Sequence, residues 1–373
     1  MATGCTVAGV QASRAVATTH TTTLAANTFH SSDTCSHRLI GIRYIGMSAD
    51  QPRFQPPDAS VAPRYTGIRT FARLPQFPVP HDGVDAAVIG VPFDTATSFR
   101  PGARFGPEAI RSASALLRPY NPALDVDVFA TLATVDGGDI AITPGNALRT
   151  TEQIDAALQP VLRAGIVPLV LGGDHSIVLG ELRAQKAVHG PVALVLLDAH
   201  ADTWDQYYGE RYFHGTPFRR AVEEGLVDPS RSLLAGMRGP LYGPGDLDEP
   251  LELGFEVITG SELAALSPGE YGERVRSRIG SDDLIRREAG PVFLSFDIDV
   301  LDPAWAPGTG TPEVAGLEPR KALAFLRALV GIPFTGFDVV EVSPPYDSAG
   351  QVTALHGAAV AYELLTLLAV SRR

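Results

Sequence analysis

Three side chains that can bind a metal ion stand at every second position of the stretch LLDAHADT, residues 196 to 203. They are Asp198, His200 and Asp202. In an extended backbone successive side chains point to opposite sides, so residues two apart point the same way. The apolar run at 192–196 that precedes them is typical of a buried parallel strand. The stretch therefore predicts a strand whose carboxyl end directs two carboxylates and an imidazole at one point.

Two other apolar stretches end in side chains of the same kinds. VPLVLGGDHS at 167–176 carries Asp174 and His175, and VFLSFDIDV at 292–300 carries Asp297 and Asp299. One such residue alone is weak evidence, because an Asp or His at a strand end often caps the following helix. Burying all of these groups in one cleft without a cation would be strongly repulsive, whereas two divalent ions would neutralise them. The predicted metal ligands are His175, Asp198, His200, Asp202, Asp297 and Asp299.

The types of ligand indicate which ions would bind. Four carboxylates and two imidazoles, with no thiolate in reach, favour a hard or borderline ion such as Mn²⁺ over structural zinc. Ligand type discriminates poorly among Mn²⁺, Ni²⁺ and Co²⁺, so the last two stay open. Two ions about 3.5 Å apart would share a water and lower its pKa towards neutrality, which provides a hydroxide nucleophile. We therefore expect a hydrolase with two Mn²⁺ ions per subunit.

Strand-like and helix-like segments alternate from Ala86 onward. Strands are predicted within 86–92, 167–176, 192–197, 232–238, 292–300 and 335–342. Helices are predicted from about 107, at 151–164, after 176, at 215–224, 270–288 and 318–329, and from about 351. Such alternation is typical of a mostly parallel sheet covered on both faces. The predicted fold class is α/β, a three-layer α/β/α sandwich.

The first 85 residues differ from the rest of the chain. Residues 1–47 are rich in Thr, Ala and Ser, and we expect them to be disordered, unless Met47 is the true start. Residues 48–85 are rich in Pro and are expected to form an irregular arm that packs on a neighbour or covers a site. The catalytic domain is expected to span 86–373.

Composition excludes several kinds of partner. The formal net charge of -12 disfavours nucleic acid, because phosphate binding requires a basic surface, and suits a small cationic substrate. No apolar run reaches the roughly 20 residues that a membrane helix needs, so no membrane is expected. Both cysteines, Cys5 and Cys35, lie in the first 46 residues, which leaves the main body without a disulfide framework. A cytoplasmic location is expected.

Three motifs resemble, in order, the signature motifs of the ureohydrolase family, which comprises arginases, agmatinases and their relatives. They are GGDHS at 172–176, DAHAD at 198–202 and SFDIDVLDPAWAPG at 295–308. The resemblance runs from about Arg64 to the C-terminus, and it implies an arginase-like fold and a homo-oligomer, a trimer or hexamer. It also implies the ligands of each manganese: His175, Asp198, Asp202 and Asp297 for one, and Asp198, His200, Asp297 and Asp299 for the other.

The resemblance also implies roles for residues around the metals. His214 would shuttle protons to the leaving amine, and Glu341 would grip the guanidinium group of the substrate. Asp174, Ser176 and Asp302 would orient ligands rather than bind metal.

The segments around the predicted substrate site differ from those of arginases. The loop TWDQYYGERYFHG at 203–215 lacks the asparagine that arginases carry there, which disfavours arginine. The motif at 90–111 and the PGTGTPE run at 307–313 are more similar to agmatinases, guanidinobutyrases and guanidinopropionases. We expect agmatine, cleaved to putrescine and urea, with guanidinobutyrate or guanidinopropionate as alternatives. The candidate tail-binding residues are Asp205 or Glu210 for an ammonium, Arg211 or Arg104 for a carboxylate, and Trp204 and Tyr207 as walls.

Two other classes of protein fit part of the pattern. A zinc deacetylase of related fold would use a single metal, which would leave His175, Asp202 and Asp299 without a role. A non-catalytic relative would lack a ligand, and none of the six is missing.

Overall fold

The computed structural model describes residues 54–280 and 290–373, together with Met1. The segment 1–47, predicted to be disordered, lies outside these residues apart from Met1. So does the last part of the helix predicted at 270–288, of which α8 (Pro268–Ile279) is described.

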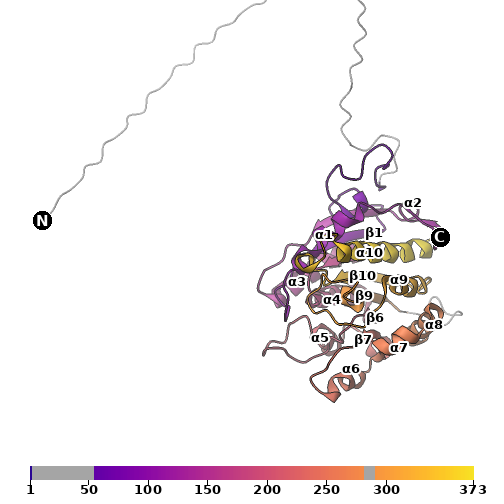
Figure 1. The fold of residues 1–373 in the computed structure, drawn as a ribbon. Coiled ribbons are helices and arrows are strands. Elements are labelled where there is room, and N and C mark those ends of the chain that lie inside the picture. Colours follow the sequence, from indigo (N-terminus) through magenta and orange to yellow (C-terminus); the bar gives the residue numbers. More distant parts are fainter. Residues whose placement is uncertain (2–53, 281–289) are drawn as a thin grey trace, which may run out of the picture. The chain divides into compact units, whose positions relative to one another are not determined.

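A parallel sheet of eight strands forms the centre of the fold (Figure 1), in the order β4-β1-β5-β10-β9-β6-β7-β8. Every neighbouring pair in it is parallel. The strands are β1 (Ala86–Val91), β4 (Thr134–Asp139), β5 (Val167–Gly172), β6 (Ala193–Leu197), β7 (Leu233–Met237), β8 (Glu256–Thr259), β9 (Val292–Asp297) and β10 (Phe334–Val340). A short antiparallel pair, β2 (Tyr120–Asn121) and β3 (Val126–Asp127), lies apart from the sheet.

Helices cover both faces of the sheet, so the predicted three-layer α/β/α class is confirmed. One face carries α1 (Gly106–Ser114), α8, α9 (Pro319–Arg327) and α10 (Val352–Ser371), which pack against one another in series. The other face carries α3 (Ala147–Arg163), α4 (Val178–His189) and α5 (Pro217–Glu223). Shorter helices are α2 (Val128–Thr131), α6 (Asp248–Glu252) and α7 (Gly260–Ala265).

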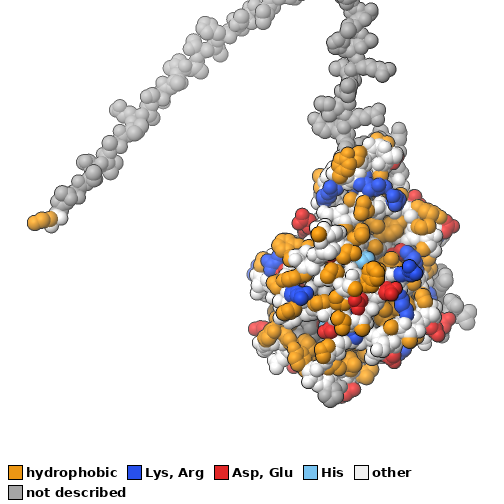
Figure 2. Space-filling model, viewed as in Figure 1, with side chains coloured by type: hydrophobic (Ala, Val, Ile, Leu, Met, Phe, Trp, Pro, Cys, Tyr) orange, Lys and Arg blue, Asp and Glu red, His pale blue; other side chains and the backbone are white. Residues whose placement is uncertain are grey.

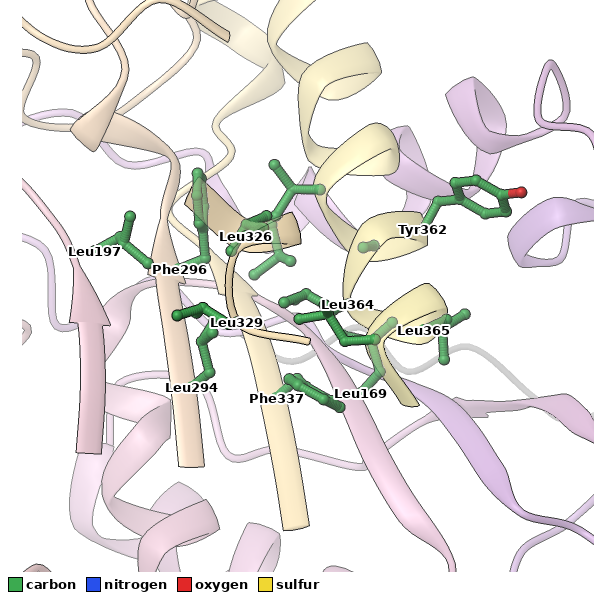
Figure 3. Packing of buried hydrophobic residues seen from close by; sticks show 14 of the residues in the cluster. Leu169, Leu197, Leu294, Phe296, Leu326, Leu329, Phe337, Tyr362, Leu364 and Leu365 are labelled. Atoms are coloured by element: carbon green, nitrogen blue, oxygen red, sulfur yellow. The ribbon is translucent and has the colours of Figure 1, made fainter. Parts of the chain in front are cut away.

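Alternation along the buried strands explains how one sheet supports two cores. In β6, Val195 and Leu197 pack into the core beneath α9 and α10, whereas Leu194 and Leu196 pack into the core beneath α4 and α5. Side chains two apart in a strand share a face. Figure 3 shows the first of these cores, where residues of the central strands meet side chains of α10 and of the region after α9.

The C-terminal helix α10 shows how length and hydropathy alone can mislead. It has 20 residues and a mean hydropathy of 1.5, which is long and apolar enough to cross a membrane, contrary to the expectation that no segment qualifies. However, 78% of the apolar stretch is buried within the fold. The helix contacts α1, α9 and β10, as a core helix does.

Two strands escaped prediction because both are edge strands with little apolar character. β4 has the sequence TVDGGD and β8 the sequence EVIT, and each pairs on one side only. The irregular character predicted for 48–85 holds for the described part, 54–85, apart from a 3-10 turn at Phe71–Arg73. Phe71 and Leu74 of this segment are buried in the chain's own core, so this part packs on its own domain.

The surface seen in Figure 2 carries both signs of charge. Basic and acidic side chains lie among apolar ones on this face, and neither sign forms a continuous field there.

Candidate functional site

Four adjacent strands in the middle of the sheet bring the predicted site residues to one edge. β5, β10, β9 and β6 are neighbours in this order and run parallel. His175 follows β5, Asp198 follows β6, Asp297 ends β9 and Glu341 follows β10. Because the carboxyl ends of parallel strands share one edge, these residues meet there.

The ligand segments are turns, not extended strands. The amide of His200 donates to Asp198 Oδ1 (2.6 Å), and the amide of Asp299 donates to Asp297 Oδ1 (2.8 Å). An aspartate commonly bonds the backbone amide two residues on in this way. The prediction that extended backbone aligns these ligands is therefore wrong. The spacing of two arises because each strand ends in a turn closed by its first aspartate.

One group of ligand atoms converges on His175. Its Nδ1 lies 3.1 Å from Asp198 Oδ2, 3.0 Å from Asp202 Oδ2 and 3.4 Å from Asp297 Oδ2. Within the described residues, neither His175 Nδ1 nor Asp198 Oδ2 makes a hydrogen bond, although both are buried. Buried polar atoms nearly always have a partner, so this convergence fits a cation between them.

A second group shares Asp198 with the first. His200 Nδ1 lies 3.0 Å from Asp299 Oδ2 and 3.6 Å from Asp198 Oδ1. Asp198 thus offers one oxygen to each group, and both groups are compact enough to hold a metal ion. The arrangement fits two divalent cations that share a carboxylate.

The electrostatics of this cluster favour added positive charge. Burial and the charges of Asp299 and Asp198 raise the pKa of Asp297 well above its ordinary value. Burial alone would lower the pKa of His175, but the facing carboxylates outweigh it and raise that pKa well above the ordinary range. The raised pKa values mean that these groups hold protons tightly, and a divalent cation would supply the same positive charge in place of those protons.

Hydrogen bonds on the far side of His175 leave its Nδ1 free to bind. Ser295 Oγ donates to Asp338 Oδ1 (2.7 Å) and lies 2.8 Å from His175 Nε2. Because the serine proton is committed to Asp338, Nε2 must carry the proton that the serine accepts. The lone pair of the imidazole then resides on Nδ1, the atom that faces the carboxylates. Neither Ser295 nor Asp338 was predicted, since an SFD motif and a strand aspartate do not reveal their contact.

His214 and Glu341 lie side by side next to this cluster. His214 Nδ1 is 3.0 Å from Glu341 Oε1, which also accepts the amide of His175 (2.9 Å). His214 Nε2 accepts the amide of Ser98 (3.0 Å) and lies 2.8 Å from its hydroxyl. Although burial opposes the charged form, the bond to Glu341 and nearby carboxylates raise the pKa of His214. Glu341 Oε2 is buried and has no hydrogen-bond partner among the described residues.

Backbone strain accompanies two of these side chains. Asp202 has φ 50° and Glu341 has φ 62°, in the left-handed region that disfavours residues with a Cβ. Such strain costs of order 1–3 kcal/mol and tends to persist where function requires it. At Asp202 the left-handed turn ends the ligand segment and brings its carboxylate back towards His175.

The three residues predicted to orient ligands divide into two kinds. Asp174 accepts the amides of Ser176 (3.0 Å) and Ala96 (2.9 Å) and the Ser176 hydroxyl, which ties the 94–98 loop to the end of β5. Burial and the charge of Glu341 raise the pKa of Asp174 to about 7. Asp302, in contrast, accepts the amides of Ala304 and Gly316. Its carboxylate holds its own loop together. No hydrogen bond joins the side chain of Asp174, Ser176 or Asp302 to a predicted metal ligand in the described residues, so only Asp174 and Ser176, which fix the turn of His175, act on a ligand, and they do so through the backbone.

Glycine allows the backbone to approach closely beneath the site at Gly173. A Cβ on Gly173 would lie 2.0 Å from the carbonyl oxygen of Phe93. The amide of Asp174 donates to that same oxygen (2.8 Å), so the close approach anchors the residue before His175.

A cavity of about 720 Å³ opens over the cluster. His200, Asp202 and Asp297 lie on its floor side, and His214 and Ser98 also line it. Part of its wall is aromatic: Trp204 and Tyr207 stack with centroids 5.0 Å apart, and Tyr207 Oη lies 2.9 Å from Tyr242 Oη.

The charged residues of this wall are not those predicted. Asp205 does not line the cavity, because it bonds the buried Arg220 (2.6 Å), and Glu210 is exposed outside the lining. Arg211 and Arg104 do not line it either, since they pair with Glu223 and Asp94. These four predictions are corrected, whereas Trp204 and Tyr207 do form part of the wall.

Four other charged residues line the cavity outside the ligand cluster and form no ion pair in the described parts of the chain: Arg100, Arg238, Asp246 and Glu313. The guanidinium of Arg238 instead donates to backbone carbonyls, among them that of Asp299 (2.6 Å), and Asp246 accepts the amide of Tyr242 (2.7 Å). Arg100 lies against the rings of Phe99 and Tyr346, 5.2 Å from each centroid, and Glu313 lies beside Gly239. Arg100 and Glu313 lie in the TSFRPG and PGTGTPE segments, which resemble those of relatives. Nothing in the sequence showed that these two segments meet at one cavity.

Comparison with known proteins gives consistent matches over most of the chain. The family model described as "Arginase family" matches residues 84–366. The guanidinobutyrase of Pseudomonas aeruginosa is 46% identical over 321 residues, 86% of this chain and 98% of that protein. The mitochondrial agmatinase of Gallus gallus is 45% identical over 84% of this chain and 89% of its own. The structure of proclavaminate amidino hydrolase from Streptomyces clavuligerus is similar with a TM-score of 0.76 and 42% identity, covering 83% and 100% of the two chains.

Proposed function

Because this chain belongs to the arginase family, we propose that it hydrolyses the guanidino group of a small linear compound to urea and a primary amine. The convergence of His175 Nδ1 with the carboxylates of Asp198, Asp202 and Asp297 is the observation that carries this proposal. Within it, His175 Nδ1 and Asp198 Oδ2 are buried and have no hydrogen-bond partner among the described residues. The family match disfavours the single-metal deacetylase.

The residues that would hold the cations are those the sequence predicted. His175, Asp198, Asp202 and Asp297 surround one position, and His200 and Asp299 join Asp198 at the other. The second role predicted for Asp297, as a ligand shared by both cations, stays a prediction. Two divalent cations, which we propose to be Mn²⁺, would activate water for attack and neutralise the carboxylates. The cytoplasmic location and the trimeric or hexameric assembly stay predictions of the sequence.

Glu341 is suited to binding the guanidinium group. Its Oε1 is occupied by His214 Nδ1 and the amide of His175, which fixes the carboxylate in place. Its Oε2 is buried and has no partner among the described residues, and a planar guanidinium N–H is a strong, charge-assisted donor. Glu341 is not itself among the residues that line the cavity, so the guanidinium would reach Oε2 by passing the lining residues His214 and Asp297. The side chain would therefore orient the substrate with its central carbon over the cluster.

His214 and Ser98 provide a route for the proton that the leaving amine requires. His214 Nδ1–H donates to Glu341, so Nε2 is the atom that can take up and release a proton. Nε2 lies 2.8 Å from Ser98 Oγ, and both residues line the cavity. Water adds its oxygen to the guanidinium carbon, the C–N bond to the tail breaks, and the amine leaves with the proton delivered by His214.

We propose agmatine as the substrate, with Glu313 in place of Asp205 and Glu210 as the acid that meets its ammonium. Glu313 lines the cavity without a basic partner among the described residues. The aromatic wall formed by Trp204 and Tyr207 also suits a cation, because the faces of aromatic rings attract positive charge.

Arg100 favours a second candidate, an acid-tailed guanidino compound such as guanidinobutyrate. It is a cation on the same cavity wall without a carboxylate partner in the described residues, and a substrate carboxylate could supply one. The relatives include proteins named guanidinobutyrase and guanidinopropionase at 46% and 43% identity.

A urea-release screen separates these candidates. Purified protein loaded with Mn²⁺ is offered agmatine, guanidinobutyrate, guanidinopropionate and arginine at equal concentrations, and bound metal is counted on the same sample. We expect two ions per chain and the highest kcat/KM with agmatine. A higher value with guanidinobutyrate would replace agmatine by the acid class, and no urea from any compound would refute the proposed reaction.

A further inference from the structure

A buried acidic side chain, Glu181 of α4, does not line the substrate cavity and has no role in the reaction described above. It is 1% exposed, and neither of its carboxylate oxygens has a hydrogen-bond partner within the described residues. An ionised carboxylate without a partner is very costly to bury, so this group requires an explanation.

The packing of α4 on β10 identifies the neighbour of Glu181. Gln185, also on α4, donates from Nε2 to the carbonyl of Thr335 (3.0 Å), and a Cβ on Gly336 would lie 2.3 Å from that nitrogen. Glu181 lies one turn earlier on the same helix face, about 6 Å along the axis. Asp338 lies two residues beyond Gly336 on the same face of the strand, about 6.6 Å along it.

The cores on either side of β10 confirm which face Asp338 occupies. Phe337 and Val339 pack in the core beneath α9 and α10, so Asp338 points to the α4 side. Its Oδ1 accepts from Ser295 Oγ (2.7 Å) and from the amide of Phe296 (3.2 Å). Its Oδ2 is buried and has no partner in the described residues.

Two neighbouring buried carboxylates that each have an unpartnered oxygen cannot both be ionised cheaply, but they can share one proton. Burial, then the charge of Asp338, raises the pKa of Glu181 well above its ordinary value. Burial raises the pKa of Asp338 as well, to about 6, but the two hydrogen bonds that it accepts at Oδ1 favour its charged form. The proton therefore belongs on Glu181.

We propose that Glu181 and Asp338 form a positioning pair. Protonated Glu181 donates to Asp338 Oδ2, Asp338 accepts from Ser295 Oγ–H, and Ser295 accepts from His175 Nε2–H. The chain of three hydrogen bonds keeps His175 in the tautomer whose Nδ1 binds a cation. This inference rests on the proposed function, because it assigns a role at the proposed metal centre.

The test is Mn²⁺ affinity, measured by competition with a chelator on cation-free full-length protein. Glu181→Met keeps the length of the side chain but removes the donor, and Glu181→Gln replaces the O–H donor by an N–H donor. We expect Glu181→Met to weaken Mn²⁺ binding about tenfold or more, as loss of a hydrogen bond behind a ligand does. Glu181→Gln is expected to stay within about twofold of the parent protein, because an amide can donate to Asp338.

Gln185→Met is the matched control. It removes a buried polar side chain from the same face of α4 one turn away, and its lost bond is to the Thr335 carbonyl and not to Asp338. We expect a lower melting temperature with unchanged Mn²⁺ affinity. If Glu181→Met does not fold, Ser295→Ala interrupts the same chain of hydrogen bonds from its other end, with the same expected loss.

The outcomes are distinguishable. Unchanged Mn²⁺ affinity in Glu181→Met, or in Ser295→Ala where that variant replaces it, overturns the inference. Equal losses in the Met and Gln variants of Glu181 overturn it too, because they would indicate packing and not hydrogen-bond donation. A parent protein that binds no Mn²⁺ and releases no urea refutes the proposed function instead.

Discussion

The metal cluster and the wall of the cavity above it are built in opposite ways. Asp198 and His175 are fully buried and follow strands of the central sheet. Asp198 closes its own turn by accepting the amide of His200, and Asp174 closes the turn of His175 by accepting the amide of Ser176. The wall is contributed by loops at 98–100, 204–208, 238–242 and 311–313. In it Tyr208 is 75% and Tyr242 80% exposed.

This difference separates the chemistry of the reaction from the choice of substrate. A buried cluster fixed by adjacent strands tolerates little change, because each unpartnered group would be costly. A loop wall can exchange side chains without disturbing the sheet. Relatives whose names give different guanidino substrates are accordingly similar to this chain over most of its length.

The sharpest test of the cluster is Asp198→Ala. This residue offers an oxygen to each ligand group, so its loss should deplete both metals and abolish urea release. Metal content per chain and kcat, measured on the same sample, give the answer. If the variant kept two ions and measurable turnover, Asp198 would not be shared by the two ligand groups. The cluster would then tolerate the loss of a side chain, as the cavity wall is expected to do.

Removing His214 should have the next largest effect. His214→Ala is expected to lower kcat by about 10²–10⁴, the usual contribution of a positioned proton donor, with two metals retained. His214→Asn is the control for the cavity that the Ala variant leaves. It fills more of the space of the imidazole but cannot transfer a proton, so it should lower kcat by a similar factor. Ser98→Ala should lower kcat less, since the backbone amide of Ser98 still contacts the imidazole. A kcat unchanged in His214→Ala would remove this residue from the proton route.

The sequence predicted the parts of the molecule in which local pattern and chemistry coincide. Apolar runs predicted six of the eight strands, and the ligands that follow them were found because each lies within a few residues of a strand end. The edge strand β4 was missed because TVDGGD has no apolar run. Ser295 and Asp338 were missed because their contact depends on the pairing of β9 with β10, which no local pattern records.

The cavity wall was predicted least well, for a physical reason that Asp205 illustrates. Its position after the DAHAD motif placed it near the metals, but Arg220 on α5 draws its carboxylate away from the cavity. Arg100 and Glu313 reach the same cavity from segments about 200 residues apart. Loop charges find partners through tertiary packing, and spacing along the chain does not reveal which ones remain free.

The free charges of the wall allow a reciprocal test with a smaller effect. Glu313→Gln should raise KM for agmatine about tenfold, the value of a hydrogen bond to a charged group, and leave kcat nearly unchanged. Arg100→Gln should do the same for guanidinobutyrate. Steady-state kinetics of both variants with both substrates provide the control, because each variant should spare the other substrate. If each variant affected both substrates equally, neither Glu313 nor Arg100 would bind the charged end of the substrate opposite the guanidinium group.

The smallest expected effect concerns the hydroxyl pair that joins two loops of the wall. Tyr207 Oη and Tyr242 Oη are 2.9 Å apart, and Tyr242→Phe removes this bond while keeping the ring. An exposed hydrogen bond contributes about 0.5 kcal/mol at the low end of the usual range, so KM should rise about twofold at unchanged kcat. Tyr65→Phe, an exposed tyrosine outside the cavity, is the control and should change neither value. A loss in kcat of tenfold or more would contradict the division between cluster and wall, because an exposed loop contact would then govern the chemical step.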